Sequence, residues 1–450
     1  MPKSLILFVF FIFISLKSIA SEKKIQLSLG EAIRHGLQEN SELKMKSQDV
    51  AFAEGRLAEV RSFMMPSISN TTLLAPIYKE TGDALRSQAD TSQWGPWIKT
   101  TTTIIQPLYA YGKATYYGGA AKQAIEAEKD QKRMKEDELI FDIKQYYYSA
   151  QAAFNVMERV EESEKKLNDV IKRVDELLKS GSGEVRKQDA YKLKTLLQEI
   201  KQKKEWVLKN QDLATRAVAF KAGYSVKDPV EIQDKVLNKE NFQLESLSHY
   251  QKLAMDSRPE MKALSEGISA RDNLVKGELT NRLPVFFIGG LIDVADTPND
   301  IRTRQGSPYA NDPYNGLNMG VGLGARWNLD LWKVNAKVQQ EKAEYHKLVY
   351  QKELADKGIP VEVEKAYLEY KEALHNIEYS TEQVDQSKKW FLQSVMAWGF
   401  GIGDSREVME SVIFKGLADK NYFEALLNHN VAIAALSKST GTELLTRLKY

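Results

Sequence analysis

The 450-residue chain contains no cysteine. This absence excludes disulfides, a cysteine nucleophile, thiolate metal sites and a lipid anchor on an N-terminal cysteine. Histidine is also scarce, and the five histidines are scattered without the spacing of metal ligands. With 63 basic and 61 acidic residues the net charge is only +2, which gives no argument for nucleic-acid binding. We therefore expect no active site, no metal, no cofactor and no nucleic-acid partner.

Long apolar runs are absent beyond the N-terminus. No stretch after residue 20 approaches 18 consecutive apolar residues, so we expect no membrane-spanning helix in the mature chain. Residues 1–20 combine a positive Lys3, an apolar run over 5–16 and small residues at Ser18-Ile19-Ala20. This order is typical of a secretory signal peptide. A retained N-terminal anchor is the alternative, which the shortness of the run disfavours.

Two pairs of segments repeat at a separation of about 220 residues. ELKMKSQDVAFAEGRLAEVRSFMMP (42–66) corresponds to EMKALSEGISARDNLVKGELTNRLP (260–284), and IKQYYYSAQAA (143–153) corresponds to VEKAYLEYKEA (363–373). A repeat of this kind predicts a duplicated architecture. We expect a signal peptide over 1–20 and two structural repeats, 21–243 and 244–450.

Each repeat is expected to contain short helices, two strands and a long helical hairpin. Ser28 and Glu31 form a capping-box pattern before a helix at 29–39, and a second helix at 41–64 is stopped by Pro66. Strands are expected at 67–78 and 97–109 around a polar loop (79–93), and at 285–294 and 317–329 around a loop at 295–316. The hairpins are expected at 113–222 and 333–438, with glycine-rich turns at 180–183 and 399–403 and an interruption at 358–360.

The strand at 317–329 alternates strictly between apolar residues and glycine or polar residues. This pattern and length suit a tilted membrane strand with apolar side chains toward lipid and small residues toward a wet lumen. The Gly320-x-Gly322-x-Gly324 run opens no helix, so it lacks the context of a nucleotide-binding loop. The predicted lipid-facing residues are Leu317, Met319, Val321, Leu323, Ala325 and Trp327. Aromatic residues near the strand ends suit interfacial girdles (Tyr78, Trp94, Trp97, Tyr109, Tyr111, Trp327, Trp332).

Four strands cannot close a membrane barrel, because the open edges would leave backbone groups unpaired in hydrocarbon. The chain must therefore oligomerise if the strands span a membrane. Two copies would give eight strands with a filled interior, and three would give twelve with room for a pore. A soluble four-stranded sandwich beside a coiled coil is the alternative.

The order of these segments resembles the TolC-like outer-membrane efflux proteins over nearly all of residues 25–441. The resemblance is carried by LSLGEAIRHGLQENSELKMK (27–46), by QPLY and YGK (106–109 and 111–113), and by NVAIAALSKSTG (430–441). It implies a mainly α fold with membrane β: a homotrimer whose long antiparallel helical hairpins form an α-barrel and whose chains contribute four strands each to a twelve-stranded β-barrel. It also implies a mixed α/β belt made by the entry strand near Ile25, the segment 224–247 and the C-terminus.

The resemblance also implies a function and partners. The protein would be a passive export duct of a tripartite efflux or type I secretion system, in the outer membrane of a Gram-negative bacterium and extending into the periplasm. Its partners would be outer-membrane lipid, a periplasmic adaptor (membrane fusion) protein and an inner-membrane transporter. The alternative is a periplasmic coiled-coil scaffold or adaptor that never inserts.

In the resembled family the hairpin tips form the periplasmic entrance and dock the adaptor. The family's two entrance aspartates align here with Met409 and Val412, so the usual acidic ring is absent. Candidate replacements at the constriction are Glu184, Asp404, Glu407 and Glu410, although acids at a helix start are also favoured by the helix dipole. Candidate docking glycines, which we also expect to supply positive φ in the turns, are Gly181, Gly183, Gly401 and Gly403.

Overall fold

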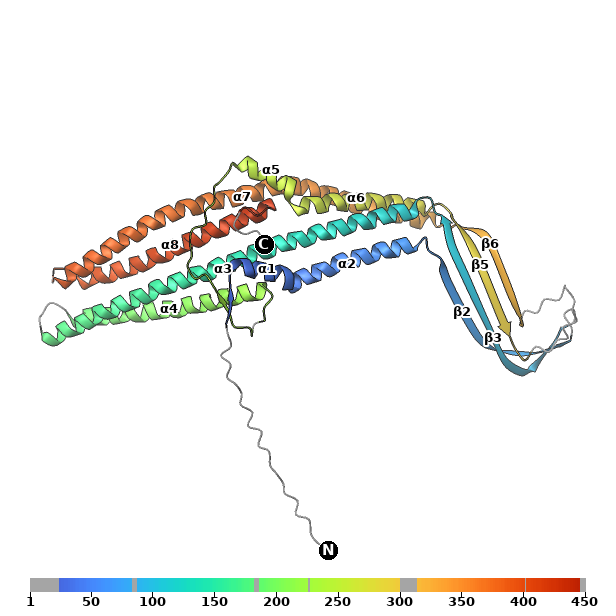
Figure 1. Ribbon diagram of the computed structural model, residues 1–450, viewed down its shortest axis with the longest axis horizontal. Helices are drawn as coiled ribbons and strands as arrows, with labels where there is room; N and C mark the ends of the chain where they lie inside the picture. Colours follow the sequence, from blue (N-terminus) through green and yellow to red (C-terminus); the bar gives the residue numbers. More distant parts are fainter. Residues whose placement is uncertain are drawn as a thin grey trace, which may run out of the picture.

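The computed structural model describes residues 24–445, except 83–86, 182–185, 226, 300–313 and 401. The predicted signal peptide (1–20) therefore lies outside the described residues. The body is elongated, with a β-sheet at one end, two helical hairpins at the other and the end of the last helix near the middle (Figure 1). The duplicated element order is present, because each half contains two shorter helices, two antiparallel strands and a long helical hairpin. The division at residues 243 and 244 stays a prediction.

The four strands of the terminal sheet are β2 (Ser67–Gly82), β3 (Ser87–Tyr109), β5 (Val285–Asp296) and β6 (Gly316–Arg326). They form one antiparallel sheet in the order β2-β3-β5-β6. Val321, in the middle of β6, is paired with Gly290 of β5, which in turn is paired with Ile104 of β3. Because paired residues lie on the same face of a sheet, this register decides which side chains share a surface.

The polar loop predicted at 79–93 is mostly strand, which is a correction. After a register shift at Tyr78/Lys79, pairing continues outward through Lys79 with Asp90 and Thr81 with Gln88. The alternation of apolar and polar residues could not predict this extension of the two strands, because neither face of the extension is apolar. Backbone hydrogen bonds between the strands, which carry no side-chain signature, hold it together.

The strand predicted at 317–329 ends at Arg326, which is also a correction. Arg326 is paired with Val285, the first residue of β5, so no partner strand lies beyond it. The chain turns away there, and the Trp327 indole donates a hydrogen bond of 3.0 Å to the Arg282 carbonyl. Most of the predicted loop at 295–316 lies outside the described residues.

Eight helices are present in the described part of the chain, and two are very long: α3 (Lys113–Ser180) and α7 (Leu331–Gly399). At about 1.5 Å per residue, each extends on the order of 100 Å. Toward the sheet they are accompanied by α2 (Ser41–Ser62) and α6 (Pro259–Thr280), and the contacts give the lateral order α2-α3-α6-α7. Toward the tips they pair with α4 (Lys187–Lys221) and α8 (Ser405–Thr440), in the order α4-α3-α8-α7.

The interruption predicted at 358–360 is wrong, because α7 continues through Pro360. Ile359 and Val363 are fully packed on either side of the proline, in a cluster with Tyr250 and Leu436. The amide of Gln251 donates a hydrogen bond of 3.3 Å to the Pro360 carbonyl. A proline removes one helix hydrogen bond, and here the surrounding core offsets that cost.

A belt surrounds the long helices at mid-length. It consists of β1 (Ile25–Leu27), α1 (Leu29–Glu39), β4 (Val230–Ile232), α5 (Leu247–Ser257) and the segment 441–445. β1 pairs in parallel with β4, and the predicted Ser28–Glu31 capping box is present at α1. The Tyr147 hydroxyl donates to the Leu27 carbonyl, which fixes the belt to α3. This confirms the expected belt segments.

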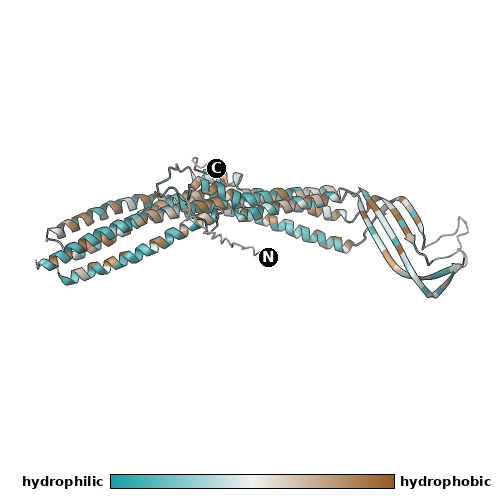
Figure 2. Ribbon diagram, turned by 60° about the horizontal axis from the view of Figure 1, so that its bottom comes forward, coloured by the Kyte–Doolittle hydropathy of each residue, from teal (hydrophilic) through white to brown (hydrophobic). Residues whose placement is uncertain are grey.

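Hydrophobic residues gather at the belt and on the strands, while the helices carry mixed surfaces (Figure 2). Within the described residues, no helix has an apolar stretch that would span a bilayer.

Candidate functional site

The sheet has one apolar face, made by every second residue of each strand. On β6 this face contains Leu317, Met319, Val321 and Leu323, which are 61%, 70%, 80% and 81% exposed. On β5 it continues through Phe286, Ile288, Ile292 and Val294, and on β2 it reaches Ile68 and Leu74. Ala325 lies on the same face, and Trp327 follows just beyond the strand and is 56% exposed. A contiguous exposed apolar surface of this extent is rare on soluble monomers.

Polar side chains on the apolar face of β2 and β3 bind one another. The Asn70 amide donates to the Thr102 hydroxyl at 2.8 Å, and the Thr72 and Thr100 hydroxyls are 3.1 Å apart. Such pairs satisfy polar groups without water, which an apolar surrounding requires.

Aromatic residues mark both ends of the apolar face. At the outer end, Tyr78 and Trp94 are paired across the strands, with ring centroids 5.9 Å apart in an edge-on arrangement. At the end joined to the helices, Tyr109 and Tyr111 lie 4.8 Å apart, near Phe286. Two such rows are typical of strands that cross a membrane.

The opposite, polar face carries small and hydrophilic residues. On β6 these are Asn318, Gly320, Gly322 and Gly324, and on β3 they include Lys99, Thr101 and Thr103. Three apolar residues, Leu73, Ile105 and Leu291, are interspersed among them. In membrane barrels, the strands have an apolar face toward the lipid and a polar face toward the lumen. The two faces of this sheet differ in the same way.

The hairpin tips form the second candidate region, and the structure describes only part of it. Gly183, Glu184 and Gly401 lie outside the described residues. Gly181 ends α3 with φ of +69°, as predicted for a turn glycine. Gly403 is not among the described glycines with positive φ, so the prediction was wrong for this position. Glycine is needed there because an added Cβ would lie 2.6 Å from the Trp398 amide nitrogen.

The described acidic candidates at the tip differ in their surroundings. Asp404 caps α8 by accepting a hydrogen bond of 3.0 Å from the Arg406 amide, and this bond lowers the pKa of the carboxyl group. Glu410 forms an ion pair of 2.9 Å with the Arg406 guanidinium. Glu407 is exposed and has no ion pair among the described residues. Asp404 thus has a structural task, and Glu407 is the free acid of the three.

Met409 and Val412, at the positions of the family's entrance aspartates, are packing residues here. Both contact a core formed between the two hairpins by residues such as Leu167, Leu193 and Phe391. These two apolar side chains pack α8 against the neighbouring hairpin. Because an aspartate at either position would have to be packed against this apolar core, the packing helps to explain why the family's entrance aspartates are absent here.

Exposed apolar residues at the second tip were missed by sequence reasoning. Phe400 and Ile402 are 81% and 83% exposed. Both residues stand inside the glycine-rich turn, and this position could have revealed them. A turn that needs only backbone flexibility does not require two large apolar side chains.

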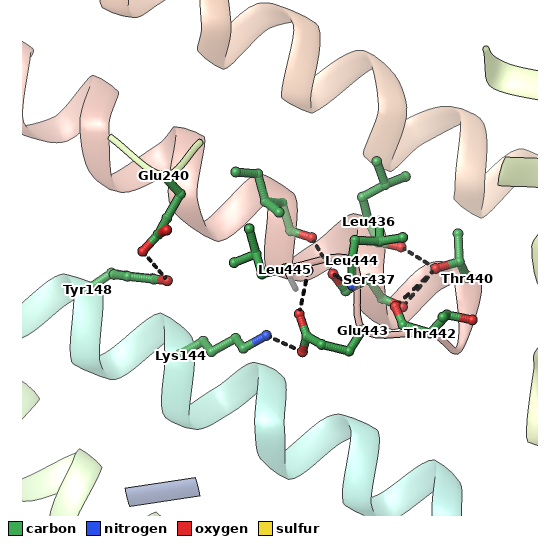
Figure 3. Close-up of polar contacts among 11 residues, drawn as sticks. Lys144, Tyr148, Glu240, Leu436, Ser437, Thr440, Thr442, Glu443, Leu444 and Leu445 are labelled. Carbon is green, nitrogen blue, oxygen red and sulfur yellow. Dashed lines mark hydrogen bonds and ion pairs between the residues drawn. The ribbon is translucent and has the colours of Figure 1, made fainter. Parts of the chain in front are cut away.

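The C-terminal segment is tied to α3 by a buried ion pair that the sequence did not reveal (Figure 3). The Lys144 ammonium donates to the Glu443 carboxylate, and only 1% of the lysine side chain is exposed. Burial lowers the pKa of Lys144, and the Glu443 charge opposes that shift. One helical turn away, the Tyr148 hydroxyl donates to Glu240 at 3.3 Å.

No His, Cys, Asp and Glu group in the described part of the chain has the arrangement of a metal site. Among the histidines, His429 is fully buried and its Nδ1 lies 3.1 Å from the Asn430 side-chain oxygen.

Comparison with solved structures bears directly on the fold. The Campylobacter jejuni CmeC outer membrane channel matches with a TM-score of 0.74 and 14% identity, over 100% of this chain and 95% of that chain. The chain has the fold of the TolC-like outer-membrane channels. The Neisseria gonorrhoeae MtrE channel in its open state (TM-score 0.73, 13% identity, 96% and 95% coverage) and the Vibrio cholerae outer membrane protein VceC (0.72, 13%, 92% and 96%) match similarly. No family model matches the chain, and no curated protein matches its sequence.

The TolC-like fold is thus retained at an identity too low for sequence comparison. It combines long α-helical hairpins with a four-stranded sheet from each chain, as the sequence predicted. The solved neighbours are channels, not enzymes.

Proposed function

We propose that three copies of this chain form a passive export channel in the outer membrane of a Gram-negative bacterium, extending into the periplasm. The observation that carries this proposal is the sheet, which has an exposed apolar face, a polar opposite face and two strands, β2 and β6, without an outer partner among the described residues. A sheet of this kind is stable in lipid only when its edges are paired and its polar face is enclosed.

The edge strands are suited to head-to-tail pairing between copies. β2 runs away from the helices and β6 runs back toward them, because the four strands alternate in direction. β6 of one copy beside β2 of the next is therefore antiparallel, and repetition closes a barrel. Three copies give twelve strands, enough to leave a pore, whereas the eight strands of two copies would be filled by side chains.

The helices support the same arrangement. At the hairpin end, α4 and α7 are the two outer helices. Trp206, Leu213 and Phe220 are exposed on α4 at heptad spacing, and Val361 and Leu368 are exposed on α7 one heptad apart, near the belt. Apolar rows repeating every seven residues are typical of helices that pack on a partner.

α4 is basic along its whole length, and one stretch of α7 is acidic. α4 has nine basic and four acidic residues, a net charge of +5. Residues 361–385 of α7 have seven acidic and two basic residues, a net charge of −5. Opposite charge beside apolar rows favours contact between α4 of one copy and α7 of the next.

Closure of the ring would surround one lumen with twelve helices and twelve strands. The chain offers no nucleotide-binding loop, so the energy for export would come from an inner-membrane transporter joined by a periplasmic adaptor. The hairpin tips, with Phe400 and Ile402 exposed, are the surface for that adaptor, and Gly181 and Gly403 shape the turns. Glu407, with Asp404 and Glu410, would place acidic rings at the entrance, where such rings attract cations.

The native mass of the detergent-purified protein from the outer-membrane fraction tests the proposal. Three chains per particle, with discrete conductance steps in a planar bilayer, are expected. A monomer in the soluble periplasm would refute the channel and favour a coiled-coil scaffold.

A further inference from the structure

Between the aromatic rows, the polar face of the sheet carries charged residues at two levels among its described strand positions; the paired Lys79 and Asp90 lie beyond the outer row. The outer level contains Lys99 of β3 and Asp293 of β5, whose side chains form an ion pair of 2.9 Å. The Thr101 hydroxyl also donates a hydrogen bond to Asp293. The two charges at this level therefore cancel.

The second level contains Arg326 alone. It is the last residue of β6 and lies on the same face as Gly324, two positions earlier. Its guanidinium carbon is 5.6 Å from the centroid of the Phe287 ring, a cation–π distance. Arg326 has no ion pair among the described residues, and its side chain is exposed. Its charge is therefore uncompensated.

Glycines hold the Phe287 ring in this position. A Cβ at Gly324 would lie 2.5 Å from the ring, and one at Gly289 would lie 3.2 Å from it. Only residues without side chains leave room for an aromatic ring flat against the strands. The glycine run on β6 thus forms a shelf for Phe287, and Phe287 in turn supports Arg326.

The position of the cluster along the pore follows from the register. Arg326 is paired with Val285, the first residue of β5 after α6, so it lies at the end of the sheet that joins the helices. Between Lys99 and Arg326 the net charge of the polar face is +1 per chain, because Lys99 and Arg326 outnumber Asp293. Three chains would carry +3 around one lumen.

We propose that the Arg326–Phe287 pairs form an anion-selecting ring where the helical tunnel meets the barrel, and that this ring favours anionic cargo, aromatic anions most. The inference rests on the trimeric channel proposed above. Guanidinium groups bind carboxylates and sulfonates through paired hydrogen bonds. An aromatic face beside each guanidinium adds a stacking surface for planar organic anions.

Ion selectivity of the purified protein in planar bilayers tests the ring. Under a KCl gradient at about 0.1 M, the chloride preference is measured as the ratio of chloride to potassium permeability relative to that of Arg326→Gln, because the acidic tips are the same in every variant. Wild type should show a preference on the order of threefold, the scale expected of three screened charges. Arg326→Glu should reverse it. The double variant Lys99→Gln/Asp293→Asn is the matched control, because it removes two charges without changing the net charge, and it should keep the preference.

Block by naphthalene-1,3,6-trisulfonate added on the barrel side tests the aromatic part. The wild-type channel should be blocked, Arg326→Gln should lose block by at least tenfold, and Phe287→Leu should weaken block while keeping the chloride preference. Equal block of wild type and Arg326→Gln, or equal permeability ratios of the two proteins, would overturn the ring and leave the channel intact. Absence of conductance in every protein would overturn the channel and the ring together.

Discussion

Replacing Val321 by arginine is the most direct test of the apolar face. Val321 is 80% exposed and stands sixth among the eleven residues of β6, midway between the two ends of the strand. Arginine on the lipid face at the bilayer midplane costs about 2–4 kcal/mol, and near an interface only about 0–1 kcal/mol. A trimer contains three copies, so we expect a cost of about 6–12 kcal/mol per barrel. Assembly in the outer membrane should fail.

The preceding residue provides the matched control. Gly320 lies on the polar face, and an added Cβ there meets no atom within 4 Å. Gly320→Arg therefore introduces the same charge one residue away without exposing it to lipid. The assay is the amount of trimer in the outer-membrane fraction, measured on gels without heating. Equal assembly of Val321→Arg and Gly320→Arg would refute the assignment of the two faces.

Three further predictions follow from other parts of the molecule. Glu443→Gln should lower the free energy of unfolding by about 3 kcal/mol, because it removes the negative charge that the buried Lys144 ammonium contacts; denaturant unfolding measures this, and a smaller loss in Lys144→Met/Glu443→Gln than the sum of the single losses should show the coupling. Burial lowers the pKa of His429 below its unfolded value near 6.5, so its contribution to stability is complete above that pH and is lost as the pH falls. The unfolding temperature of the wild type should therefore decrease more between pH 7 and pH 5 than that of His429→Phe, and parallel curves would contradict this. Gly181→Val, which strains a φ of +69°, and Gly403→Leu, which meets backbone at 2.6 Å, should reduce export of a cargo while trimers still reach the membrane; normal export by both variants would remove the docking role of the tips.

Periodicity predicted the elements well where one face of an element differed from the other. The β6 alternation and the Ser28–Glu31 capping box were both readable, since each places a side chain of one type at a fixed interval. The outward extension of β2 and β3 was not readable, because both of its faces are polar and backbone pairing leaves no pattern in the side chains. The helix break predicted at Pro360 was wrong for a related reason. The lost helix hydrogen bond is a local effect of the proline, whereas the core around Ile359 and Val363 that offsets it is built by segments distant in the sequence.

The candidate sites divide in the same way. The apolar face of β6 could be named in advance, residue by residue, because strand geometry alone places alternate side chains together. The need for glycine at position 403 could not be predicted, because it arises from a close approach of this residue to the Trp398 backbone. The proximity of Arg326 and Phe287 could not be predicted either, because it depends on the register of the strands.

The sequence by itself determined the duplication, the alternating strands and, for strands that span a membrane, the need for partner copies, because these depend on period, length and the energy of unpaired backbone in lipid. Only the tertiary structure decided which charges are cancelled and which remain. Lys99 meets Asp293 across two strands, and Lys144 meets Glu443 across 299 residues of chain, whereas Arg326 lies beside the Phe287 ring and has no ion pair among the described residues. Charge pairing depends on distances of a few ångströms between remote residues, and such distances exist only once the chain has folded.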